Sequence, residues 1–266
     1  MLKTDYTEKQ LGKGNVRVYD FGDVKLHAFE TKDLIDDEVF VLEKDGKGVV
    51  IELPPFFENI EELTAYINDS GIEVEGILAP YHLAGGTFMP SVPVYMTAEA
   101  DKYGREGGGK ALIDNFTAAF DDAFDSSLPA PSTIIEGDEL ELAGITFGIV
   151  RNDEAYDITI PEINAVYTHM LGHDCHSIVA GAGHADAIIA QLEGYKNAGV
   201  DLILTSHYTP EDLKDVQVKI DYLNELKAIA AESTDAADFK AKVAARFPEY
   251  AGDNYLDMTA GFFFGE

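Results

Sequence analysis

The sequence predicts a mixed α and β protein in which two blocks of strands are each followed by helices. Short β-rich runs fill the first fifty residues and recur between residues 133 and 167. Helical patterns follow each block, so the order strands–helix–strand–helix appears twice. No repeat, low-complexity tract or linker divides the 266 residues. We therefore expect one α/β (α+β) domain, residues 1–266, in which helices cover the sheets.

The first block begins with four short runs of β-branched and aromatic residues. We expect strands at 16–19, 24–29, 39–43 and 49–53. The turn Asp45–Gly48 separates the last two runs and predicts a hairpin. A helix is expected over 58–69, because Ile60 and Leu63 begin an apolar face, and Gly71 follows as a stop.

A glycine-rich break interrupts the rest of the first half. Strands are expected at 76–79 and 92–96, and residues 98–124 are expected to be largely helical. The break, Gly104–Gly109 followed by Lys110, matches the start of a phosphate-binding loop. However, Ala111 replaces the required hydroxyl, and no strand directly precedes the loop. The sequence therefore favours a flexible connection between two helical pieces.

The second half repeats the pattern. After the β-rich stretch 133–167 we expect a helix at 185–196 and a buried strand at 201–205 that ends at Ser206-His207. Pro210 is expected to open a long amphipathic helix. Its apolar positions are Leu213, Val216, Val218, Ile220, Leu223, Leu226 and Ile229. A further helix is expected at 236–246, and the apolar tail Met258–Phe264 is expected to dock as a final strand or plug.

Charge and composition narrow the classes of partner. Lys plus Arg number 19 and Asp plus Glu number 49, which gives a net charge of −30. DNA and RNA binding need clustered cations, so we expect no nucleic-acid partner. The apolar runs are too short to span a membrane. No signal region is expected, because residues 1–6 contain no apolar run, and no internal disulfide is expected, because Cys175 is alone; both fit a cytoplasmic protein. We therefore expect the partner to be a small-molecule substrate or ligand, and the oligomeric state is left open.

Most of the histidines fall near predicted strand ends, where functional sites are often built. His82 follows one strand, His169, His173 and His176 follow another, and His207 ends a third. Neutral imidazole is a good ligand for zinc, iron or manganese. Carboxylates such as Glu154, Asp153 and Asp174 could complete a ligand set. His27, alone within a strand-like run, is expected to be structural.

Four stretches resemble the metallo-β-lactamase fold superfamily. Residues 46–52 and 76–86 resemble its opening strand, acidic residue and Gly-Gly loop, and residues 161–167 and 200–207 resemble two of its later strands. Glu154-Ala155, His173–His176 and Ser206–Pro210 are most similar to the alkylsulfatase-type branch. The resemblance implies a four-layer αββα sandwich, in which two β-sheets are flanked by helices, and a metal-dependent hydrolase.

The departures from the superfamily motif matter for the metal site. In the family pattern T-H-x-H-x-D-H, Pro80, Ala84 and Gly85 replace three ligands and His82 is retained; in an alternative alignment His82 stands at the Asp position. Glu52 replaces the acid of the Ile-Asp pair. The position of the bridging acid holds His169, or Met170 after a one-residue shift. The resemblance thus implies a remodelled site with one divalent metal ion. The expected ligands come from His82, Glu154, His169, His173 and His207.

Three functions stay open at this point. The first is a hydrolase with this degenerate site, acting on a small ester or on a sulfated or phosphorylated compound; Tyr81 would donate a hydrogen bond to an oxyanion. The second is a non-catalytic relative that binds a small molecule or presents an interaction surface. The third is a metal-free enzyme in which His173 acts as general base with Asp174 or Glu154. The first is ranked slightly above the second, and the third well behind.

Overall fold

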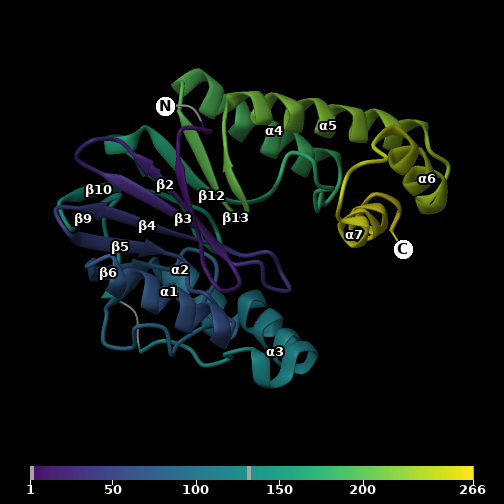
Figure 1. Ribbon diagram of the computed structural model, residues 1–266. Coiled ribbons are helices and arrows are strands. Elements are labelled where there is room, and N and C mark those ends of the chain that lie inside the picture. The colour runs from purple at the N-terminus through teal and green to yellow at the C-terminus, as the bar shows by residue number, and fades with distance from the viewer. Residues whose placement is uncertain (1–2, 131–132, 266) are drawn as a thin grey trace. The chain divides into compact units, whose positions relative to one another are not determined.

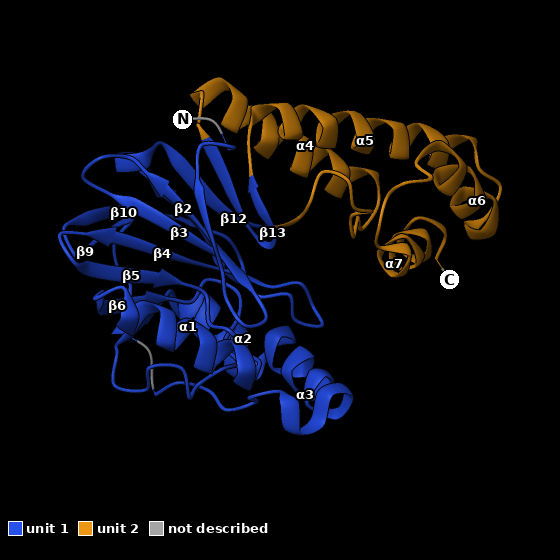
Figure 2. Ribbon diagram, viewed as in Figure 1, with its two compact units in different colours: residues 1–169, 202–210 blue, residues 170–201, 211–266 orange. Residues whose placement is uncertain are grey.

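The computed structural model describes residues 3–130 and 133–265 and divides the chain into two compact units (Figures 1 and 2). Unit 1 comprises residues 1–169 and 202–210, and unit 2 comprises residues 170–201 and 211–266. Unit 1 holds nearly all of the β structure, whereas unit 2 is helical. That the two units fold as the single domain expected from the sequence stays a prediction. No helix in the described part of the chain has the length and apolar character needed to cross a membrane.

The larger sheet of unit 1 has eight strands that follow one another in chain order. They are β1 (Thr7–Gln10), β2 (Asn15–Asp20), β3 (Lys25–Glu30), β4 (Glu38–Lys44), β5 (Lys47–Ile51), β6 (Glu73–Leu78), β7 (Val94–Met96) and β8 (Thr133–Ile134). Strands β1 to β5 are antiparallel and β5 to β8 are parallel. The predicted hairpin is confirmed as β4–β5. Strand β1 was not predicted, because all four of its residues are polar and exposed.

The smaller sheet has five strands in the order β13-β12-β11-β10-β9. They are β9 (Glu139–Leu142), β10 (Ile145–Arg151), β11 (Tyr156–Ile160), β12 (Ala165–Leu171) and β13 (Leu202–Glu211). Burial alternates along β10 and β11, which gives this sheet one inward face. The expected strand ends are wrong here: His169 lies within β12, and His207 lies within β13. Strand β13 continues through the polar residues that the sequence pattern assigned to a loop.

Helices α1 (Phe57–Asp69), α2 (Ala98–Glu106) and α3 (Gly108–Phe120) belong to unit 1, with two short 3-10 turns at Asp121–Ala123 and Pro161–Ile163. Helix α1 buries the predicted apolar face and is followed by Gly71 at φ +70°. The glycine run at the α2–α3 junction is a packing contact, not a flexible loop. A Cβ at Gly104 would lie 2.7 Å from Leu83 Cδ2, and one at Gly109 would lie 2.9 Å from the Tyr103 ring.

Unit 2 contains α4 (Ala182–Ala198), α5 (Leu213–Glu232), α6 (Ala236–Arg246) and α7 (Asp253–Phe264). Pro210 does not open α5 as expected, because it lies in β13 and Asp212 caps the helix in a capping box with Asp215. The expected strand or plug at the tail is also wrong. These residues form α7, which packs on α6: the rings of Phe263 and Phe239 stack with centroids 5.6 Å apart.

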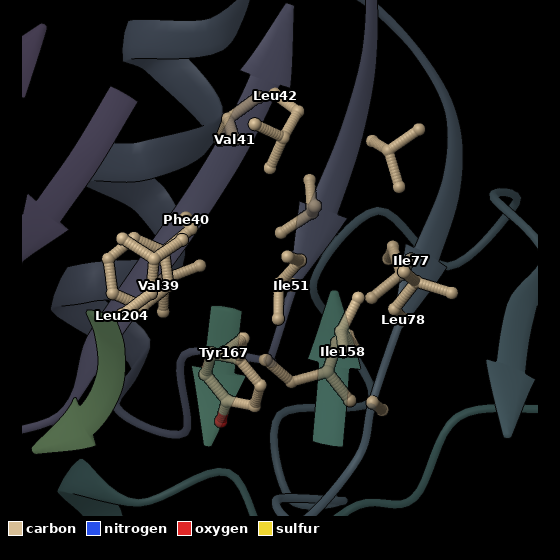
Figure 3. Close-up of a cluster of buried hydrophobic side chains, with 14 of the residues drawn as sticks. Val39, Phe40, Val41, Leu42, Ile51, Ile77, Leu78, Ile158, Tyr167 and Leu204 are labelled. Carbon is tan, nitrogen blue, oxygen red and sulfur yellow. The ribbon is translucent and has the colours of Figure 1, made fainter. Parts of the chain in front are cut away.

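The core of unit 1 lies where side chains of the two sheets meet (Figure 3). Phe40 and Leu42 from β4, together with Ile51 from β5, project toward Ile158 of β11 and Tyr167 of β12. All five are fully buried. Buried residues of α1 join the same cluster, which places a helix layer on the larger sheet. The predicted arrangement of sheets with helices packed on them is therefore observed within unit 1.

Truncation of Leu42 tests this core. Leu42 is 0% exposed, whereas Leu34, in the loop before β4, is 68% exposed. We expect Leu42→Ala to lower the free energy of unfolding by about 2–5 kcal/mol, because it removes buried methyl groups and leaves a cavity. The matched change Leu34→Ala should stay within about 0.5 kcal/mol. Urea unfolding of both variants measures the difference, and equal losses would contradict the packing described here.

Candidate metal centre

Three imidazoles from separate segments of unit 1 converge at one point. His82 comes from the loop after β6, His169 from β12 and His207 from β13. The Nε2 atom of His169 lies 3.3 Å from Nε2 of His82 and 3.2 Å from Nε2 of His207. All three nitrogens belong to a group that can hold a metal ion. We call these residues the histidine trio.

The spacing of the trio fits a single divalent ion. Zinc binds imidazole nitrogen at about 2.0–2.1 Å, so two ligands at a tetrahedral angle are about 3.3 Å apart. Burial lowers the pKa of His169 to about 3 and, with the charges of the other two rings, brings the pKa of His82 well below its usual value. Both rings are therefore neutral near pH 7, and a neutral ring can offer the Nε2 lone pair to a metal.

A buried carboxylate lies behind two of the three rings. The Nδ1 atoms of His207 and His82 lie 3.1 Å and 3.7 Å from Oδ1 of Asp37, whose side chain is 2% exposed. The carbonyl oxygen of Ile35 lies 3.2 Å from Nδ1 of His207. Burial alone would lower the pKa of His207, but its interactions with Asp37 outweigh burial and raise it. Burial raises the pKa of Asp37 to about 7.

Glu52 holds the loop that carries His82. It follows β5 directly, adopts φ +70°, and is 0% exposed. Its carboxylate accepts the backbone N–H groups of Tyr81 and His82 at 3.0 and 2.9 Å. It also accepts the hydroxyl of Tyr167 at 2.6 Å. Burial raises the pKa of Glu52 to about 8, although all three donors favour the ionised form.

Tyr81 stands beside the trio, but its hydroxyl is engaged elsewhere. Its ring stacks on His169 with centroids 4.7 Å apart. The hydroxyl donates to Asp157 Oδ1 at 2.8 Å and accepts from Asn152 Nδ2 at 3.1 Å. Burial, followed by the charge of Asp157, raises the pKa of Tyr81. The ring thus supports His169, and the expected role of the hydroxyl as an oxyanion donor stays a prediction.

The other residues expected at the site lie apart from the trio. Glu154 is exposed in the turn before β11, where its backbone N–H bonds to Asn152 Oδ1. Asp174 is exposed, and its backbone carbonyl accepts a hydrogen bond from Ala251. Neither belongs to a metal-binding group among the described residues. Of the five ligands expected from the sequence, the structure assembles three in unit 1 and places His173 in unit 2.

His173 belongs to a second group, with Glu211 and Asp215. Its ring Nδ1 and its backbone N–H lie 2.7 and 2.8 Å from the same oxygen of Glu211, and its Nε2 lies 3.6 Å from Asp215 Oδ1. The hydrogen bond to Glu211 raises the pKa of His173. Nearby, the buried amine of Lys219 donates to the carbonyls of Gly172 and Cys175. His173, with its raised pKa, and the amine of Lys219 lie close to the two carboxylates, so this group is explained as an internal charge network.

Sequence reasoning missed Asp37 altogether and read Glu52 only as a departure from the family motif. The sole signal for Asp37 was an acidic run, Asp36-Asp37-Glu38, directly before an apolar strand. Such a run usually marks a solvated turn. Only the burial of its second member, next to two imidazoles, reveals a different use.

Comparisons with known proteins agree with this architecture. No family model matches the chain, and no curated protein matches its sequence. A metallo-β-lactamase family protein from Thermus thermophilus superposes with a TM-score of 0.62 at 13% identity, covering 91% of each chain. A metallo-β-lactamase from Erythrobacter litoralis gives 0.57 at 12% identity, covering 82% of this chain and 100% of the other.

The stereoselective inverting sec-alkylsulfatase Pisa1 from Pseudomonas sp. is also similar, with a TM-score of 0.59 at 14% identity. The match covers 89% of this chain but only 49% of the sulfatase. Identities this low concern the fold and not the activity. Together with the two sheets and their helices, these likenesses confirm the predicted fold class: the chain has the metallo-β-lactamase fold.

Proposed function

We propose that the protein is a hydrolase that uses one divalent metal ion, zinc, iron or manganese, held by His82, His169 and His207. The observation that carries this proposal is the approach of two Nε2 atoms, those of His82 and His207, to within 3.2–3.3 Å of Nε2 of His169, in a group whose ligand atoms all lie within 4.8 Å of one another. Nitrogen atoms at this spacing cannot all bond to one another, since each contact needs a proton on one side only. A shared cation satisfies the three lone pairs together.

The chain's own residues would each serve this centre in a distinct way. When bound, a divalent ion supplies Lewis acidity and makes water a better nucleophile at neutral pH. The ring of Tyr81 supports His169 by stacking, and Glu52 holds the backbone of His82. Three imidazole ligands supply no anionic charge, and among the described residues no carboxylate belongs to the trio's group. A second cation would therefore lack the bridging acid that offsets charge in two-metal sites, which favours one ion.

The charge of the chain bears on the substrate. The sequence carries a net charge of −30, so the protein surface is strongly acidic. Anionic sulfate and phosphate groups would be repelled by this acidic surface, whereas a neutral ester would not. We therefore place a small ester ahead of a sulfated or phosphorylated compound as substrate. The fold alone does not decide between these reactions.

A metal-free, non-catalytic binding protein is the alternative. The features that favour it are Pro80, Ala84 and Gly85, which replace ligands of the family motif and leave only His82 in that segment. In this reading the trio would be an imidazole cluster within a ligand pocket. Metal content separates the two proposals directly.

Elemental analysis of untagged protein tests the metal proposal. We expect about one equivalent of zinc, iron or manganese per chain, because one set of three nitrogens is available. His169→Ala should reduce the content to near zero, since His169 lies between the other two ligands. His173→Ala is the matched control and should leave the content unchanged. Hydrolysis of p-nitrophenyl acetate should follow metal content and exceed hydrolysis of the corresponding sulfate and phosphate.

Two results would contradict this assignment. Equal metal loss in His169→Ala and His173→Ala would remove the distinction between the two groups. Wild-type protein that takes up no metal after reconstitution would favour the binding protein instead.

The role of Glu52 gives a separate prediction. In Glu52→Gln one acceptor oxygen becomes an NH₂ group, so a donor would face the backbone N–H of Tyr81 or His82. We expect a loss of about 1–3 kcal/mol in the free energy of unfolding. Glu38→Gln is the control: Glu38 is also buried, but its Oε1 accepts no hydrogen bond. Thermal unfolding compares the two, and a loss in Glu38→Gln as large as that in Glu52→Gln would refute the specific role of Glu52.

A further inference from the structure

We propose that Asp37 is a positioning residue that serves two metal ligands at once. Its buried carboxylate lies beside the Nδ1 atoms of His82 and His207 and attracts a proton to each of them, which leaves both Nε2 lone pairs available on the side of His169. The inference rests on the proposed function, because it concerns how the trio is prepared for a cation. Nothing in the family motif or in the sequence pattern assigned a role to this residue.

A rigid turn delivers Asp37 to the two rings. The backbone carbonyl of Asp37 accepts hydrogen bonds from the N–H and the hydroxyl of Thr31, at 3.2 and 2.7 Å. The backbone N–H of Asp37 donates to Asp33 Oδ1 at 3.2 Å. The carbonyl of Thr31 is in turn held by the Asn59 side chain of α1 at 2.7 Å. The turn therefore has its own hydrogen bonds, and it leaves the Asp37 carboxylate free for another use.

The carboxylate itself is the unusual feature. It is 2% exposed, and neither of its oxygens makes a hydrogen bond of good geometry within the described structure. Burying a polar group without hydrogen-bond partners is costly, so such a group calls for an explanation. The polar atoms that approach it are the Nδ1 atoms of His207 and His82, at 3.1 and 3.7 Å. Both distances end on the same oxygen, Oδ1.

The position of Asp37 beside the two Nδ1 atoms determines which nitrogen of each ring carries the proton. A proton on Nδ1, attracted by Asp37, leaves Nε2 unprotonated in a neutral imidazole. For His207 the carbonyl of Ile35, at 3.2 Å, favours the same tautomer. Outer carboxylates of this kind orient metal-bound histidines and make them stronger ligands. One carboxylate behind two rings couples them, so its loss affects two of the three ligands.

Zinc affinity measured by competition with a chromophoric chelator tests the proposal. Loss of an outer partner typically weakens metal binding about 10–100-fold, and we expect Asp37→Asn to fall in this range and Asp37→Ala to weaken binding further. Asp36→Asn is the matched control, because Asp36 is the exposed neighbour with the same charge. It should change the affinity by less than about threefold, since an exposed charge is screened by water.

The possible results distinguish the role of Asp37 from the existence of the metal centre. If the wild-type protein binds zinc and the zinc affinity of Asp37→Asn lies within about threefold of the wild-type affinity, the role of Asp37 is refuted while the metal centre stands. Equal weakening in Asp36→Asn and Asp37→Asn would likewise refute it, because the effect would then be one of net charge. If wild-type protein binds no zinc, both claims fail.

A measurement on the wild-type protein covers the case in which the variants do not fold. Long-range ¹H–¹⁵N spectra of the imidazoles report which ring nitrogen carries the proton. We expect His82 and His207 to carry it on Nδ1, with and without zinc. A proton on Nε2 of either ring in the metal-free protein would overturn the proposal.

Discussion

The buried carboxylate of Glu52 is the interaction on which the candidate centre depends. It lies at the end of β5 in the larger sheet and accepts hydrogen bonds from the loop that carries His82. Through Tyr167 it also reaches β12 of the smaller sheet, and Tyr167 bonds in turn to Ser206 of β13 at 2.6 Å. One acidic group thus connects the segments that supply all three histidines. Because it is fully enclosed, these bonds fix the segments in register.

The histidine trio is supported by acidic groups on more than one side. Glu52 acts on the backbone of one ligand, whereas Asp37 approaches the ring nitrogens of two. In the proposed centre the three imidazole ligands would hold a cation without adding negative charge. Two-metal hydrolytic sites need an acid that bridges the ions, and the sequence resemblance aligns His169 with the position of that acid. The replacement of an anionic ligand by an imidazole is the chemical reason to expect one ion.

The sequence predicted those elements whose patterns are local. The hairpin at Asp45–Gly48, the helix over 58–69 and the helix over 236–246 have turn residues or apolar faces that need no distant partner. Strand β1 was not predicted, and helix α7 was predicted as a strand or plug. In both cases tertiary packing determines the structure. The trio was among the expected ligands through the family resemblance, but so were Glu154 and His173. Only three-dimensional placement separates these residues, and the burial of Asp37 has no sequence signature.

Anomalous diffraction at the zinc absorption edge, from crystals grown with zinc, tests the central claim most directly. We predict one strong peak per chain, within bonding distance of Nε2 of His82, His169 and His207. Two peaks at this place would mean that a second cation is held without the bridging acid. A peak only at His173, Glu211 and Asp215, or no peak at all, would contradict this assignment, because the trio would then not be a metal centre.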